Sequence, residues 1–316
     1  IYTARDNRAE RMEQFHPYLQ LTPPLVDPER LSSNREEVTI FFLGGSTTEF
    51  KDAEGTGWPQ RVETRLRDEG RHGDVRAFNL GRQWYTSLHT LVNYQANLRH
   101  HRPDVIVVMH AINDLLHNAD FSYFSRGEFR EDYGHFQGPL VHLIGPPRTL
   151  LRSAWSRFKQ LWYNTPRTVV SQEQFPGLDP FGRTLDTLID HARLDGTAVV
   201  LMSQPNVSAE HLSEVVKQAG TLVNNAAVGP TRKWDHDTAA RGMRAYHERA
   251  RAIARERGVT FIDLEAQVPK TLEYFYDDVH YQDGTFDLVA RVVSQALRDA
   301  DILPAKATDP GPDGGA

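Results

Sequence analysis

Short runs of consecutive apolar residues alternate with longer amphipathic segments along most of this chain. The apolar runs lie at residues 38–43, 75–80, 104–110, 197–203 and 259–264. A run in which nearly every residue is apolar is typical of a strand that is covered on both faces. Apolar residues recur at helical spacing in the segments 58–69, 87–101, 181–194, 235–257 and 284–299. Strands that are separated by helices predict βαβ units and a parallel sheet.

Three segments fall outside this alternation. Residues 1–37 are polar, contain several prolines and are predicted to form an N-terminal arm laid over the domain. Residues 304–316 are rich in proline and glycine and are predicted to be a disordered tail. The third segment, from about residue 115 to 180, shows no strand pattern and is predicted to be an insertion. We therefore expect one α/β domain over residues 38–303.

The insertion contains an amphipathic stretch that carries aromatic residues. Apolar residues recur at helical spacing between positions 150 and 162, with Trp155 and Trp162 among them, and residues 148–170 include basic but no acidic side chains. One interpretation is a lid or a helix that lies on a membrane surface, with the two tryptophans in contact with the substrate. The other is a helix whose apolar stripe packs on the core.

Composition and charge narrow the class of protein. The chain has 316 residues, a net charge of −6 and no cysteine. This length suffices for one large core. Nucleic-acid-binding domains are usually basic, so we expect no nucleic-acid partner. The lack of cysteine excludes structural disulfides and thiolate metal sites. No apolar stretch reaches the roughly 18 to 20 residues of a membrane span.

The sequence indicates neither a metal nor a cofactor. His100 and His101 are adjacent, so their side chains would point apart on a helix. Residues 234–237 contain histidine and aspartate but lack the spacing of a zinc site. There is no glycine-rich phosphate loop and no dinucleotide-binding fingerprint.

Four short polar motifs lie beside predicted strands and helices. Three follow apolar runs, and the fourth precedes the last helix. They are Gly44-Gly45-Ser46-Thr47, Asn79-Leu80-Gly81, Asn113-Asp114 and Asp277-Asp278-Val279-His280. The carboxyl edge of a parallel sheet is where open α/β folds place their ligands, and Ser46 would lie there. An aspartate three residues before a histidine can hold the imidazole ring while that ring takes a proton from a serine.

Taken alone, each of these residues has an ordinary structural explanation. Ser46 could cap a helix, Gly81 and Asn113 could occupy turns, Asp277 could be a turn residue, and His280 could lie in the core or on the surface. Their joint occurrence in this order favours catalysis over five separate structural roles.

The four motifs, in this order, resemble those of the SGNH (GDSL-type) hydrolase family, over residues 38 to about 297. The resemblance implies a flavodoxin-like, three-layer α/β/α domain with five parallel strands in the order 2-1-3-4-5. It also implies that Ser46 is the nucleophile, His280 the general base and Asp277 the acid that orients the base. The oxyanion hole would then consist of the N–H groups of Ser46 and Gly81 and the side-chain amide of Asn113.

The resemblance is not complete. The family's Gly-Asp-Ser-Leu core has Gly45 in place of the aspartate here, and its Gly-x-Asn-Asp motif begins with Ala111. Neither difference removes a catalytic group. We interpret Asp114 as a structural residue that fixes the loop carrying Asn113, and we expect Asp278 to be free at the loop surface.

We therefore expect a serine esterase that acts through an acyl-enzyme on an O-acyl or O-acetyl ester of a carbohydrate, or on a small-acyl ester. The substrate would be a small molecule, a glycan or a lipid, and residues 148–170 are a candidate membrane contact. Three alternatives remain: an O-acetyltransferase on the same triad, a glycosidase that uses Asp277 and Asp278, and a non-catalytic domain that binds a glycan or a protein partner.

The sequence also raises an expectation about location. The chain begins with Ile1 rather than methionine, which suggests that a signal peptide, a membrane anchor or another segment was removed. Residues 16–19 resemble an arm found in envelope-associated members of the family. We therefore expect an exported or membrane-anchored protein of the bacterial cell envelope, with a cytoplasmic location as the alternative.

Overall fold

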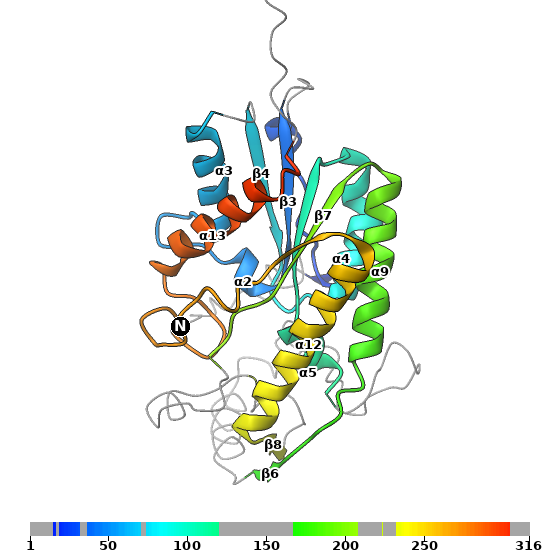
Figure 1. Ribbon diagram of the computed structural model, residues 1–316, viewed down its shortest axis with the longest axis vertical. Helices are drawn as coiled ribbons and strands as arrows, with labels where there is room; N and C mark the ends of the chain where they lie inside the picture. Colours follow the sequence, from blue (N-terminus) through cyan, green and yellow to red (C-terminus); the bar gives the residue numbers. More distant parts are fainter. Residues whose placement is uncertain are drawn as a thin grey trace, which may run out of the picture.

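The computed structural model describes residues 15–16, 19–31, 37–70, 74–119, 167–207, 223 and 232–303. Its centre is a parallel sheet of five strands in the order β4-β3-β5-β7-β9 (Figure 1). These strands are β3 (Val38–Gly44), β4 (Val75–Gly81), β5 (Val105–Met109), β7 (Ala198–Met202) and β9 (Thr260–Ile262). When only these five strands are numbered, in chain order, their order across the sheet is 2-1-3-4-5. The predicted flavodoxin-like topology is therefore confirmed.

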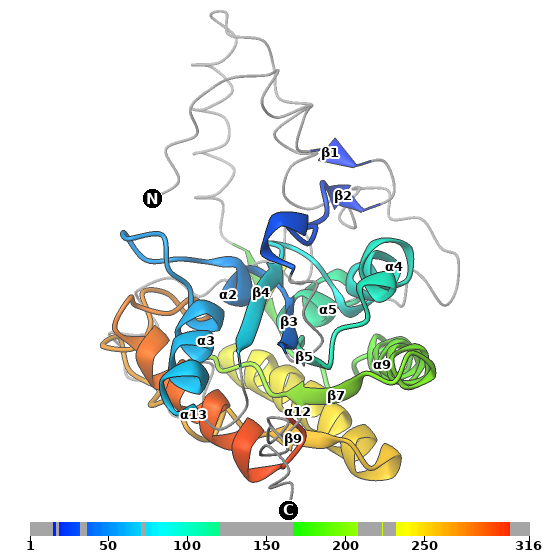
Figure 2. The ribbon, with the colours of Figure 1, turned by 90° about the horizontal axis from the view of Figure 1, so that it is seen from above.

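Helices cover both faces of the sheet (Figure 2). One face packs against α3 (Trp58–Asp68) and α13 (Thr285–Asp299), and Ile40 and Phe42 point into that layer. The other face packs against α4 (Ser87–Asn93), α9 (Leu178–Leu194) and α12 (His236–Arg257), and receives Phe41 and Leu43. Successive side chains of a strand point to opposite faces, so a strand covered on both sides must be apolar throughout.

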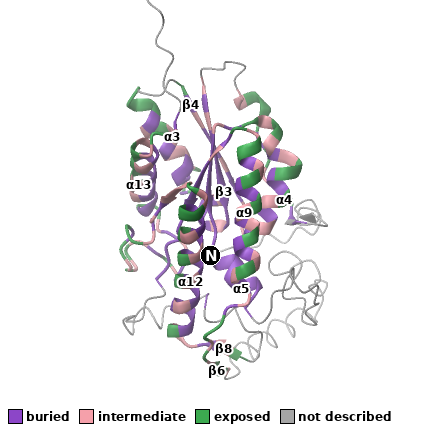
Figure 3. Cartoon of the chain, turned by 45° about the vertical axis from the view of Figure 1, so that its right-hand side comes forward, coloured by how far each residue is buried: buried purple, intermediate pink, exposed green. Residues whose placement is uncertain are grey.

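The burial pattern follows from this three-layer arrangement (Figure 3). All five residues of β5 are buried, as are six of the seven residues of β3. The helices are amphipathic and turn their apolar faces toward the sheet. The five predicted strands and five predicted helices are all present, with ends that differ by a few residues; the segment 87–101 ends as a π-helical turn at Tyr94–Leu98 and a 3-10 turn at Arg99–His101.

Several short elements were not predicted. β6 (Thr168–Val170) pairs in parallel with β8 (Arg232–Trp234) in a separate two-stranded sheet, so the insertion does contain a strand. Within the N-terminal arm, β1 (Phe15–His16) pairs with β2 (Gln20–Leu21), and a 3-10 turn forms at Pro28–Arg30. Strands of two or three residues are too short to show a hydrophobic period, which explains why the sequence pattern misses them.

Some predictions fall on residues outside the described part of the chain. Trp155, Trp162, most of residues 148–170 and the tail 304–316 belong to this group. The lid and membrane-contact interpretations therefore stay predictions. Among the described residues, no helix is both long and apolar enough to cross a membrane.

Candidate active site

Ser46 lies at the carboxyl edge of the sheet, just past β3. β3 ends at Gly44, and Ser46 is the first residue of the four-residue helix α2 (Ser46–Glu49). The two preceding glycines are required by close contacts. A Cβ atom on Gly44 would lie 2.3 Å from Thr48 Oγ1, and one on Gly45 would lie 2.8 Å from Asn113 Nδ2. The glycine that replaces the family's aspartate thus makes room for the Asn113 amide beside Ser46.

A continuous chain of hydrogen bonds joins Ser46, His280 and Asp277. Ser46 Oγ lies 2.9 Å from His280 Nε2, and His280 Nδ1 lies 2.7 Å from Asp277 Oδ2. The other carboxylate oxygen of Asp277 accepts the backbone N–H groups of Val279 and His280, at 2.8 and 2.6 Å. The structure therefore brings together the three residues that the sequence analysis selected for the triad.

The environment of Asp277 keeps its carboxyl group ionised. Burial acts to raise the pKa of Asp277, but the hydrogen bond and charge of the His280 ring, together with two backbone N–H groups, bring that pKa below its usual value. An ionised Asp277 favours the imidazole tautomer with its proton on Nδ1. His280 Nε2 then has a free lone pair to accept the proton of Ser46.

Two aromatic rings limit the orientations open to His280. Its ring stacks on Phe50, with centroids 4.9 Å apart and planes 20° apart, and on Tyr276, with centroids 5.4 Å apart and planes 9° apart. Phe50 directly follows α2, whereas Tyr276 precedes Asp277 on the loop that carries the histidine. The side chain of Tyr276 is half exposed, so it forms part of the rim of the site. No motif in the sequence had indicated this contact.

Asn113 lies at the start of the helix that follows the neighbouring strand. That helix is α5 (Ile112–His117), which comes directly after β5, and Asn113 is buried. One amide hydrogen of Asn113 Nδ2 is donated to the Tyr85 carbonyl at 2.9 Å. An amide group has two hydrogens, so the second remains for another acceptor. The helices α2 and α5 (Figure 1) follow the adjacent strands β3 and β5, so Ser46 and Asn113 share one edge of the sheet.

The N–H of Gly81, which is predicted to be an oxyanion donor, has an acceptor within the protein. Gly81 ends β4, and its N–H donates to Asn79 Oδ1 at 3.2 Å. A Cβ atom at this position would lie 2.6 Å from the backbone nitrogen of Glu49. The close approach that demands glycine here is therefore to α2 rather than to a substrate.

Trp84 stands out in the turn that follows Gly81. Its φ is +65°, a left-handed conformation that is uncommon for a residue other than glycine. Among the described residues, no acceptor binds its N–H. The neighbouring N–H groups all have acceptors: Arg82 donates to the Gly44 carbonyl (3.0 Å), Gln83 to Glu49 Oε2 (2.6 Å) and Tyr85 to the Arg82 carbonyl (3.0 Å). The sequence analysis missed Trp84 because a positive φ is usually signalled by glycine.

The prediction for Asp278 is wrong. Only 2% of this residue is exposed, and its Oδ2 accepts the backbone N–H of Val223 at 3.0 Å. Its carbonyl accepts the N–H of Val207 at 2.9 Å. The spacing to His280 identifies which aspartate can reach the imidazole ring, but it does not say what lies on the other side of the loop. There, Asp278 holds two backbone segments that precede α12.

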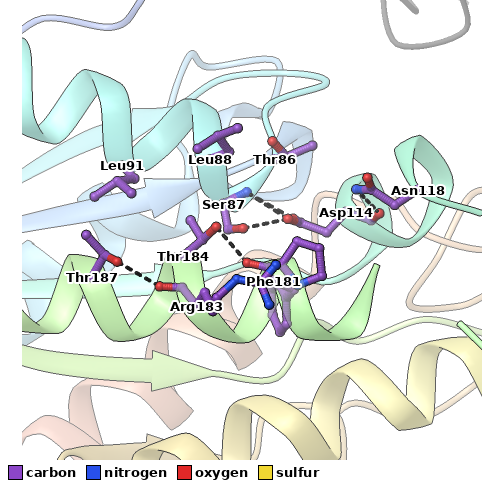
Figure 4. A pocket seen from close by; sticks show the side chains of 11 residues that line it. Thr86, Ser87, Leu88, Leu91, Asp114, Asn118, Phe181, Arg183, Thr184 and Thr187 are labelled. Atoms are coloured by element: carbon purple, nitrogen blue, oxygen red, sulfur yellow. Dashed lines mark hydrogen bonds between the residues drawn. The ribbon is translucent and has the colours of Figure 1, made fainter. Parts of the chain in front are cut away.

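Asp114 makes the contacts expected of a residue that fixes the Asn113 segment. Its carboxylate accepts the backbone N–H of Ser87 at 2.9 Å and the Ser87 hydroxyl at 2.5 Å, which ties the start of α4 to α5 (Figure 4). Burial raises the pKa of Asp114 to about 7, although the Ser87 hydrogen bonds oppose that increase.

A cavity of about 260 Å³ lies beside Asp114, between α4 and α9 (Figure 4). Its lining includes Ser87, Asn118 and Thr184 but no residue of the triad. Among the described residues, no group of three histidine, cysteine or acidic side chains could hold a metal ion.

Two buried histidines, His89 and His247, predict that the stability of the protein depends on pH. Burial lowers the pKa of His89 to about 4 and that of His247 to about 4. In the unfolded chain a histidine has a pKa of about 6.5 and binds a proton that the folded protein excludes. The free energy of unfolding should therefore fall as the pH decreases from about 6.5 to about 4, by up to about 1.4 kcal/mol per pH unit for each histidine.

The variant His89→Asn tests this expectation, because an asparagine oxygen can replace His89 Nδ1 as acceptor of the Thr86 N–H. In urea unfolding between pH 4.5 and 7.5, the two proteins should have the same slope above about pH 6.5, and below it the slope of the variant should be smaller by up to about 1.4 kcal/mol per pH unit. Asp114, whose raised pKa acts in the opposite direction between about 4 and 7, is common to both proteins. If the free energy of unfolding depends on pH in the same way in both proteins, His89 does bind a proton in the folded state, and the expectation is wrong.

Comparisons with known proteins agree with the fold. The model of the GDSL-like Lipase/Acylhydrolase family matches residues 42–284. No curated protein matches the chain. Among solved structures, a catalytic mutant of an acetylxylan esterase from Geobacillus stearothermophilus is 16% identical, with a TM-score of 0.52 over 82% of this chain and 94% of that one. The acetyl xylan esterase AlAXEase is 14% identical, with a TM-score of 0.50 over 82% of this chain and 100% of that one.

Proposed function

The chain belongs to the GDSL-like lipase/acylhydrolase family and is a hydrolase that acts on ester bonds, and on this premise we propose that Ser46, His280 and Asp277 are its catalytic triad. The observation that carries the proposal is the chain of hydrogen bonds from Ser46 Oγ through both ring nitrogens of His280 to Asp277 Oδ2. Such a chain supplies a serine with a base and supplies that base with a partner that fixes its tautomer.

The proposed reaction has two steps. In the first, Ser46 Oγ attacks the carbonyl carbon of the ester while its proton moves to His280 Nε2. The same proton then passes to the departing alcohol oxygen as the ester C–O bond breaks, which leaves an acyl group on Ser46. In the second, a water molecule gives a proton to His280 Nε2 and attacks the acyl carbon, and the proton returns to Ser46 Oγ as the acid leaves. Asp277 stabilises the imidazolium in both steps.

The negative charge that develops on the substrate oxygen needs hydrogen-bond donors. We assign the N–H of Ser46 and the second amide hydrogen of Asn113 to this oxyanion hole. For the third donor, the geometry favours the Trp84 N–H over the predicted Gly81 N–H, because the former has no acceptor among the described residues and the latter donates to Asn79. One such donor is typically worth roughly 3 to 4 kcal/mol of the barrier.

We further propose that the acyl group is small, with an O-acetyl carbohydrate as the substrate class. The support is the likeness in fold to two acetylxylan esterases. The measurement is kcat/KM for p-nitrophenyl esters from acetate to palmitate, together with acetate release from acetylated xylan. Activity should be greatest on acetate and should fall as the acyl chain grows.

A control identifies the acyl acceptor. The same assay with an added sugar measures whether the acetyl group is transferred to water or to a hydroxyl group of the sugar. Free acetate should remain the main product. A preference for palmitate would contradict the small-acyl proposal, and predominant transfer to the sugar would favour the acetyltransferase.

A further inference from the structure

A buried glutamine links the two short helices of the candidate site. Gln204 lies just past the end of β7, and 2% of it is exposed. Its Nε2 donates to Thr47 Oγ1 at 3.0 Å, and its Oε1 accepts the N–H of Ile112 at 3.0 Å. Thr47 directly follows Ser46, and Ile112 directly precedes Asn113. One amide group therefore joins the helix that carries the proposed nucleophile to the helix that carries the proposed oxyanion donor.

Neither helix can hold its own position. α2 has four residues and α5 has six, and helices of this length are not stable without tertiary contacts. The residue that precedes α5 is Ala111, which provides no side-chain cap. The N–H groups in the first turn of a helix have no partner within the helix, so the Ile112 N–H depends on an acceptor from elsewhere. Gln204 supplies it.

The surroundings of this link are closed to solvent. Thr47 and Ile112 are 1% and 2% exposed, respectively. Losing the glutamine would leave a buried N–H without an acceptor, and such a group is costly in a dry interior. A movement of α5 that restores an acceptor for this N–H would also move Asn113 relative to Ser46.

We propose that Gln204 is a positioning residue for ester hydrolysis, which sets the separation between Ser46 and Asn113 by holding α2 and α5 together. This inference rests on the proposed function of those two residues. Gln204 does not touch the reacting atoms, so its removal acts on the geometry of the transition state. Displacements of about 1 Å at a site of this kind can cost roughly 100-fold in rate.

The experiment is a double-mutant cycle between Gln204→Met and Thr47→Val. Methionine keeps the length of the side chain without its amide, and valine keeps the shape of threonine without its hydroxyl. We expect Gln204→Met to lower kcat on p-nitrophenyl acetate by roughly 10- to 100-fold with little change in KM. Gln204→Glu should recover part of this loss, because one carboxylate oxygen can still accept the Ile112 N–H and the other can accept the Thr47 hydroxyl.

Non-additivity is the distinguishing result. The double variant should lose less than the product of the two single losses, because both changes break the same hydrogen bond. Additive losses, or a Gln204→Met protein with wild-type kcat, would overturn the proposal. If Gln204→Met does not fold, the kcat values of Thr47→Val and Gln204→Glu decide, and wild-type values in both would also overturn it.

A second glutamine provides the matched control. Gln172 donates to the Ala119 carbonyl at 2.7 Å, just past the end of α5, and accepts from Trp234 Nε1 at 3.0 Å, so it also links two segments but has no hydrogen bond to α2 or the triad. Gln172→Met should lower the melting temperature and leave kcat unchanged.

Labelling of the wild type by a fluorophosphonate distinguishes a failure of the proposed function from a failure of the inference about Gln204. A wild type that is neither labelled at Ser46 nor hydrolytic would overturn the proposed function and this inference together, whereas an active wild type with an indifferent Gln204 would overturn the inference alone.

Discussion

Replacing Ser46 with alanine should lower the turnover of p-nitrophenyl acetate by a factor of roughly 10⁴ to 10⁶ and leave the fold intact. The Ser46 hydroxyl has one hydrogen-bond partner among the described residues, His280, so its loss removes the nucleophile without breaking a structural contact. Alanine also favours the helical conformation that α2 requires. The measurement is kcat beside a thermal unfolding curve.

Ser294→Ala is the matched control for this variant. Ser294 is buried in α13, where its hydroxyl donates to the Arg291 carbonyl of the same helix at 3.1 Å. That contact lies outside the triad, so kcat should stay at the wild-type value. A Ser46→Ala protein that keeps more than about a tenth of wild-type turnover would remove Ser46 from the role of nucleophile.

Replacing Asp277 with asparagine should cost roughly 10⁴-fold in kcat. The amide group would present a donor to His280 Nδ1 and favour the tautomer whose Nε2 already carries a proton, so Ser46 would have no base. The fold should persist, because the amide oxygen can still accept the backbone N–H groups of Val279 and His280. Kinetics and thermal unfolding of the same preparation separate these effects.

Asp278→Asn is the control for Asp277→Asn. Asp278 is buried against Val223 rather than exposed, so its substitution is expected to affect stability. The amide oxygen can still accept the Val223 N–H, and kcat should stay within a few-fold of wild type. Equal losses of activity in the two variants, or a larger loss in Asp278→Asn, would instead indicate a carboxyl pair of the kind that glycosidases use.

The fold was largely accessible from the sequence because its central strands are buried on both faces. The residues of β5 are all apolar because each faces one helical layer or the other. The order of the strands came from the family resemblance, since apolar runs alone do not determine which strands are neighbours. The β6–β8 sheet could not be predicted, because three-residue strands carry no period and their pairing joins Thr168 to Arg232, far apart in the chain.

For the candidate site too, one part could be predicted from the sequence and another could not. Its chemical groups lie in short local motifs, and the structure places Ser46, Asp277 and His280 within hydrogen-bond distance of one another. The groups that hold the site in place are single residues without a motif. Gln204 reaches Thr47 across 157 positions and Ile112 across 92, and a pattern in one sequence cannot show such contacts.

The surroundings of Asp278 and Gly81 show the same limit. The environment of Asp278 depends on Val223, which no local pattern connects to it. The environment of Gly81 depends on α2 packing against the end of β4, so a glycine that looked suited to a substrate is needed by a neighbouring helix. In both cases the contact that explains the residue is made across the fold.

The central claim is that Ser46 is an activated nucleophile, and a fluorophosphonate probe tests it most directly. The folded protein is incubated with the probe, its intact mass is measured, and the labelled peptide is identified by tandem mass spectrometry. We expect one adduct per chain, located on Ser46, absent from Ser46→Ala and formed far more slowly in Asp277→Asn. Labelling of a different serine, or undiminished labelling of Ser46→Ala, would contradict the account.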